Sequence, residues 1–132
     1  MYLTGRGAGL GWVILSTPCN SPFQKHQEFV ASPLMAESLA LREAVQSCVE
    51  KELKEVCFES DSAQLIKSIA SGNGLSEIYG VAFDILSSAA LFKSASFNWI
   101  PRERNILADN LAKDASFVGE TRVVELTFMV PN

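Results

Sequence analysis

The chain has 132 residues, of which 48% are hydrophobic and 20% are charged. This size and composition suit one packed core; they exclude a disordered or fibrous chain and leave too little sequence for two ordinary domains. The formal net charge of -4 excludes an overall positive field, so any contact with nucleic acid must come from a local patch or from bound metal.

The first elements are predicted to form a hairpin. Residues 9–15 are rich in strand formers and follow several glycines, residues 16–22 carry turn residues, and residues 27–31 look like a returning strand. Because residues 24–28 are polar, the second segment can also be read as a loop.

Ser32 and Pro33 are typical of a helix start, and the helix is expected to run to about Leu53. At helical spacing, the acidic Glu37 lies on the same stripe as three apolar residues, Leu41, Ala44 and Cys48. A carboxylate on a buried stripe is costly unless something pairs with it. Glu37 is therefore the first candidate site residue.

Residues 55–60 predict a short buried strand, and Asp61 follows at its carboxyl end, where open α/β sheets place their ligands. A helical pattern begins at Ala63 and stops at residues 71–74. Another helix is predicted to begin at Ser76 or Glu77 and to extend to about Ala89.

Residues 94–100 alternate in polarity and predict a strand with Phe97 and Trp99 on one side. Asn105 is a candidate N-cap for a last helix that reaches Ala115, and the tail 122–130 again resembles a strand. The element order predicts the α/β class, with a mixed sheet flanked by helices.

Three acids stand at element ends that such a sheet can bring together: Glu37, Asp61 and Asp109. Clustered carboxylates repel one another unless cations neutralise them or some of them are protonated. A pair of Mg²⁺ ions held in this way supports phosphodiester cleavage. On spacing alone, three capping or solvated acids are the simpler interpretation.

Four fragments occur in the order of a known family. They are Gly7–Ile14, Ala36–Leu41, Glu59–Ser62 followed by Leu65–Ile66, and Trp99–Lys113. From Gly7 to about Ser116 the chain resembles the ribonuclease H type 1 superfamily, and within it the plant reverse-transcriptase-like branch related to non-LTR retroelements. The resemblance implies the RNase H fold.

The resemblance also implies that Glu37, Asp61 and Asp109 are three of four metal-binding acids. With Mg²⁺ or Mn²⁺ these acids hydrolyse the RNA strand of RNA–DNA hybrids. The family's histidine has no counterpart, and we expect His26, the chain's one histidine, at the surface. The nucleic-acid-binding candidates are Arg102, Arg104 and Asn105; for the two arginines, a phosphate contact and a solvated loop charge are equally good interpretations.

The chain departs from the family at its N-terminus. Family members begin with a central strand that ends in an aspartate, whereas no acid precedes Glu28 here. Three interpretations are open: the sequence is truncated, which we favour; another chain supplies the missing strand; or the tail, residues 122–130, takes the place of that strand in the sheet. We therefore divide the chain into an RNase H-like domain, 1–120, and a tail, 121–132, whose one acid is Glu125.

The inherited activity is therefore expected to be RNA–DNA hybrid hydrolysis by an endonuclease. The missing aspartate favours an inactive hybrid-binding module, and an α/β domain with a purely structural role is a third possibility. The resemblance implies a nucleic-acid partner, an RNA–DNA hybrid or another nucleic acid. A membrane is not expected, because no apolar run approaches the roughly 20 residues that span a bilayer. The odd number of cysteines, Cys19, Cys48 and Cys57, favours an intracellular setting, cytoplasmic or nuclear, with each thiol as a packing residue.

Overall fold

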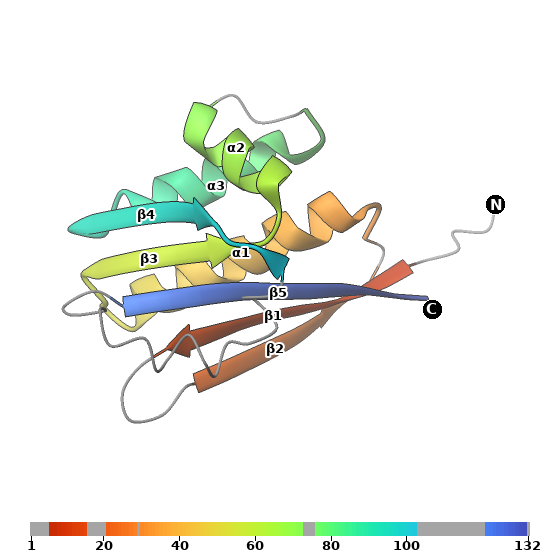
Figure 1. Ribbon diagram of the computed structural model, residues 1–132, viewed down its shortest axis with the longest axis horizontal. Helices are drawn as coiled ribbons and strands as arrows, with labels where there is room; N and C mark the ends of the chain where they lie inside the picture. Colours follow the sequence, from red (N-terminus) through yellow and green to blue (C-terminus); the bar gives the residue numbers. More distant parts are fainter. Residues whose placement is uncertain (1–5, 16–20, 29, 73–75, 103–120, 132) are drawn as a thin grey trace.

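The computed structural model of the chain describes residues 6–15, 21–28, 30–72, 76–102 and 121–131 (Figure 1). In chain order the elements are β1 (Arg6–Leu15), β2 (Ser21–Gln27), α1 (Pro33–Glu50), β3 (Glu55–Ser60), α2 (Ala63–Ser71), the 3₁₀ helix η1 (Ser76–Ile78), α3 (Tyr79–Ala89), β4 (Ser94–Trp99) and β5 (Thr121–Pro131). The helix predicted to begin at Asn105 lies outside the described residues.

The five strands form one mixed sheet in the order β2-β1-β5-β3-β4. β5 is last in the chain but lies in the middle of the sheet, between β1 and β3 (Figure 1). It pairs antiparallel with β1 over the whole length of that strand, and parallel with β3 from Val56–Thr121 to Glu59–Val124. The tail segment thus supplies the backbone partners that β1 and β3 need along their facing edges.

The predicted fold class, a mixed sheet flanked by helices, is confirmed. The second strand was placed wrongly: it spans Ser21–Gln27, not residues 27–31. Its polar residues are compatible with pairing because β2 is an edge strand, and Gln24, Lys25 and His26 are exposed. Phe23 is partly buried and stacks on Trp12 at 5.5 Å between ring centroids.

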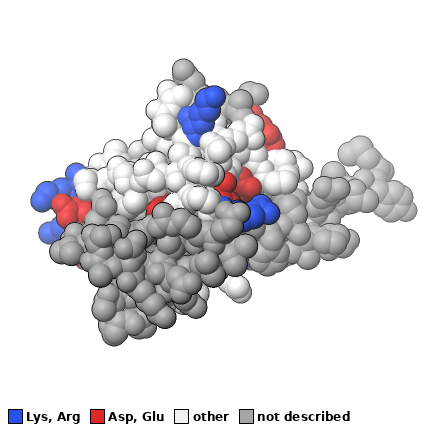
Figure 2. Space-filling view, viewed as in Figure 1, with Lys and Arg blue, Asp and Glu red and all other residues white. Residues whose placement is uncertain are grey.

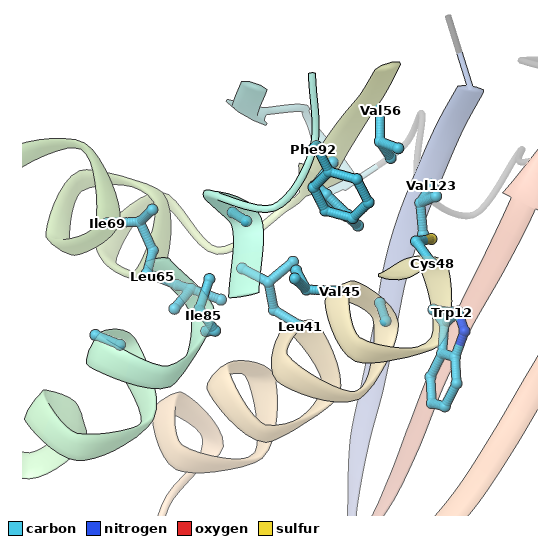
Figure 3. Close-up of a cluster of buried hydrophobic side chains, with 14 of the residues drawn as sticks. Trp12, Leu41, Val45, Cys48, Val56, Leu65, Ile69, Ile85, Phe92 and Val123 are labelled. Carbon is cyan, nitrogen blue, oxygen red and sulfur yellow. The ribbon is translucent and has the colours of Figure 1, made fainter. Parts of the chain in front are cut away.

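The core lies on one face of the sheet, where α1, α2 and α3 pack against the strands (Figure 3). Phe58 of β3 is fully buried, and its ring contacts those of Phe92 and Phe97 at 5.9 Å and 5.2 Å between centroids. The labelled members of the cluster are Trp12, Leu41, Val45, Cys48, Val56, Leu65, Ile69, Ile85, Phe92 and Val123. Burial of these side chains against one another holds the helices on the sheet.

The predicted stop after α2 is also confirmed. The helix ends at Gly72, whose φ of 70° lies in the left-handed region where glycine is favoured. Within the described ranges, no helix combines the length and apolar character needed to cross a membrane.

Candidate functional site

Two of the three predicted acids, Glu37 and Asp61, come together where the start of α1 meets the end of β3. Ser32 caps α1 by accepting a hydrogen bond from the Met35 backbone N–H at 3.1 Å, which places Glu37 in the second turn. Asp61 directly follows β3, and Ser62 caps α2 by accepting from the Leu65 N–H at 3.2 Å. An N-cap thus fixes the backbone near each of the two acids: Ser32 near Glu37 and Ser62 next to Asp61.

Glu37 is half-buried, and its carboxyl group interacts electrostatically with that of Asp61, which directly follows β3. Burial raises its pKa above the ordinary value, and the negative charge of Asp61 adds to the rise. A hydrogen bond with the Ser62 side chain and the positive charge of Arg102 act in the opposite direction. The stripe predicted for α1 is confirmed: Leu41, Ala44 and Cys48 are buried, and Glu37 lies at its end.

A third carboxyl group reaches this place from β5. Because the pairing of β3 with β5 runs to Glu59–Val124, Glu125 comes level with Ser60, the residue before Asp61. Glu125 is 1% exposed. Burial raises its pKa well above the ordinary value, and the negative charges of Glu37 and Asp61 raise it further. Glu125 therefore belongs to the same electrostatic cluster as the two predicted acids.

Glu125 is the one acid of the tail, and nothing in the sequence indicates that it would reach the site. The missing signal was the pairing partner of β5, which local patterns do not specify. Val123 of β5 packs in the same core cluster as residues of α1. Because side chains alternate along a strand, Glu125, two residues later, lies on that same face of the sheet, toward Glu37.

Arg102 and Trp99 both interact with Asp61. The Arg102 Nε atom is 3.5 Å from the Asp61 carboxylate, and the Trp99 indole N–H donates to the Asp61 backbone carbonyl at 3.1 Å. Arg102 is 79% exposed and Asp61 18%, so the guanidinium group extends from the acid into solvent. Asp109, Arg104 and Asn105 lie outside the described residues.

The donor chemistry suits a hard divalent cation such as Mg²⁺. Carboxylate oxygens are its preferred protein ligands. Burial is the main cause of the raised pKa values of Glu37 and Glu125, and the negative charge of Asp61 adds to both rises; a cation would offset that added repulsion. Among the residues that the structure describes, however, no three histidine, cysteine, aspartate or glutamate side chains are grouped closely enough to hold a metal ion. Arg102 is the cation that compensates Asp61 here.

The remaining expectations concern single side chains. His26 is exposed on β2, as predicted for a surface residue. Cys48 and Cys57 are buried free thiols, which confirms their role in packing, and burial raises the pKa of Cys48 to about 11. Cys19 lies outside the described residues.

The mixed five-stranded sheet flanked by helices is the fold of a ribonuclease H-like domain. The N-terminal RNase H domain of Rv2228c from Mycobacterium tuberculosis, solved as a fusion with maltose-binding protein, superposes with a TM-score of 0.67 at 21% identity over 86% of this chain and 89% of that one. RNase H1 from Halobacterium salinarum NRC-1 gives 0.69 at 19% identity over 88% of this chain and 90% of its own. At these identities the likeness establishes the fold.

The chain belongs to the reverse transcriptase-like family, whose model matches residues 3–115. β5 (Thr121–Pro131) lies beyond the matched range although it is central in the sheet. Among curated protein sequences no match is found. The plant branch of the family stays a prediction.

Proposed function

We propose that this domain binds RNA–DNA hybrids and that its inherited activity is metal-dependent hydrolysis of the RNA strand. The observation that carries the proposal is the electrostatic cluster of Glu37, Asp61 and Glu125, contributed by α1, the end of β3 and β5. Membership in the reverse transcriptase-like family and the RNase H-like fold support it.

Glu37, Asp61 and Asp109 are the proposed ligands of Mg²⁺ or Mn²⁺, and Glu125 is a fourth candidate. When bound, the cation would activate a water molecule and stabilise the leaving oxygen. The chain's own contribution is positioning: Ser62 bonds the Glu37 side chain, and Trp99 and Arg102 hold the backbone and the carboxylate of Asp61. Arg102, together with Arg104 and Asn105, is proposed to contact the nucleic-acid backbone.

The test is a cleavage assay on a hybrid with a labelled RNA strand, in Mg²⁺ and in Mn²⁺, beside duplex DNA and duplex RNA of the same sequence. We expect cleavage of the hybrid alone, and its loss in Glu37→Gln and Asp61→Asn. The matched control is Glu43→Gln on the same helix, because Glu43 pairs with Lys25 of β2 at 2.9 Å instead of joining the cluster. Equal cleavage by all three variants would refute the assignment of the acids.

A second function is a hybrid-binding module without turnover. It is favoured by the ion pair between Arg102 and Asp61, which supplies positive charge at the acid cluster from the protein itself. Binding of the hybrid in EDTA, with neither cleavage nor a rise in melting temperature when Mg²⁺ is added, would establish this second function in place of the first.

A further inference from the structure

The aromatic side chain of Trp99 is exposed and lies next to the cluster of Glu37, Asp61 and Glu125. Trp99 is the last residue of β4 and pairs with Ser60, the residue before Asp61. Its side chain is 52% exposed. The sequence pattern places Trp99 on the same side of β4 as Phe97, yet Phe97 stacks on Phe58 in the core while Trp99 extends past the end of that core.

The polar edge of the Trp99 ring is tethered. Its indole N–H donates to the Asp61 carbonyl at 3.1 Å, and the next residue, Ile100, donates its backbone N–H to Ser60 at 2.9 Å. The tether satisfies the one polar group of the side chain and restricts its rotation, while half of its surface stays open to solvent. An aromatic ring held in this way loses little conformational entropy when a flat partner stacks on it.

The net charge of the protein makes such a local stacking contact important for binding. The net charge is -4, and on the described part of the face in Figure 2 the positive side chains lie apart from one another instead of forming a continuous patch. Long-range attraction to a phosphate backbone is therefore weak, so affinity must come from local contacts. Ring stacking needs no net charge, and Arg102, three residues after Trp99 in sequence and 3.5 Å from Asp61, supplies one local positive group.

We propose that Trp99 stacks on an unpaired nucleobase, so that the preferred ligand of this site is a hybrid duplex continued by a single-stranded overhang. Bases inside a duplex hide their faces against their neighbours, whereas an unpaired base offers one to an exposed ring. Arg102 contacts a phosphate near that base. This inference rests on the proposed function, because it assumes that nucleic acid reaches the acid cluster.

Binding is measured with the full chain in EDTA by fluorescence anisotropy, using a blunt hybrid and the same hybrid with an RNA overhang of a few nucleotides. The wild type should bind the overhang substrate about tenfold more tightly, near the low end of what base–aromatic stacking contributes. Trp99→Leu should lose this preference and Trp99→Phe, which keeps a ring, should retain most of it. Leu91→Ala is the control, because Leu91 is an exposed apolar residue just before the opposite end of β4.

Tryptophan fluorescence gives a second readout. Trp99 is exposed and Trp12 is buried, so the overhang substrate should quench the wild type, and Trp99→Phe should remove the quenching. Far-UV circular dichroism and thermal melting show whether each variant is folded.

The outcomes separate the two proposals. Wild-type binding with equal affinity for both substrates would overturn the stacking role and leave the proposed function standing. An equal loss on both substrates in Trp99→Leu would indicate packing against the duplex itself and would also overturn it. Absence of hybrid binding by the wild type would overturn both.

Discussion

Glu125 and Trp12 lie directly opposite each other in the antiparallel pair formed by β5 and β1. Both side chains are buried, and the Trp12 indole N–H has no hydrogen-bond partner among the described residues. A carboxyl group and an indole from opposite ends of the sequence thus meet inside the sheet beside α1. This arrangement makes the ionisation of Glu125 costly and gives it a nearby fluorescent reporter.

Replacing Glu125 with glutamine should stabilise the protein at neutral and alkaline pH. The pKa of Glu125 is raised in the folded state, so between its unfolded value and its folded value the native protein binds more protons than the unfolded chain. Stability therefore falls as pH rises through that window, from about 4.5 upward. Urea unfolding in EDTA at several pH values should show this fall in the wild type and a smaller one in Glu125→Gln.

The matched control for this titration is Glu50→Gln, an exposed position at the end of α1. It should keep the wild-type pH dependence. Stability of the wild type that rises from pH 5 to 8, or an equal change in both variants, would contradict the electrostatic role of Glu125.

Ser62→Ala should have two effects where most cap substitutions have one. Loss of the cap on the Leu65 N–H removes about 1 kcal/mol of stability, and loss of the bond to Glu37 raises the pKa of that carboxyl further. Urea unfolding measures the first effect, and an NMR titration of the Glu37 side chain measures the second.

Ser32→Ala is the comparison, because Ser32 caps α1 through the Met35 N–H and donates its hydroxyl to the Glu77 carboxylate, while it is not among the groups that shift the pKa of Glu37. It should reduce stability by a similar amount while leaving the Glu37 titration unchanged. If both variants shift the pKa of Glu37 equally, the hydrogen bond with Ser62 does not control that pKa.

Arg102→Gln should weaken hybrid binding and lower its salt dependence. One phosphate contact fewer reduces the slope of log Kd against log salt concentration by about one. Lys93→Gln is the control, since Lys93 is an exposed cation just before the start of β4 and pairs only loosely with Glu55, at 3.9 Å. Anisotropy titrations from low to high salt should show parallel lines for the control and the wild type, and a shallower line for Arg102→Gln. Three parallel lines would remove Arg102 from the interface.

Ending the chain after Glu120 should abolish cooperative unfolding. Without β5, one edge of β1 and one edge of β3 lose their backbone partners, and Val123 and Val124 leave the interior. Circular dichroism with thermal melting tests this expectation, and removal of Asn132 alone is the control, because β5 ends at Pro131. A shortened chain that still melts cooperatively would mean that β5 is dispensable.

Local patterns predicted the elements better than their pairing. Helical spacing placed Glu37 on the α1 stripe, and the strand end placed Asp61 beside it, because both features are set within a few residues of sequence. The second strand was misplaced since its polar residues gave no alternation to read, and only pairing with β1 defines an edge strand of that kind. Glu125 was missed as a site residue because its position depends on contacts between distant parts of the chain.

The central place of β5 also governs how the protein folds during synthesis. The pairs β1 with β2 and β3 with β4 leave the ribosome first, and among the described strands only β5, residues 121–131, joins the two pairs. Contacts between segments so distant in sequence form slowly, and until they form the unpaired strand edges can pair wrongly. The nascent chain should consequently depend on chaperones until β5 emerges.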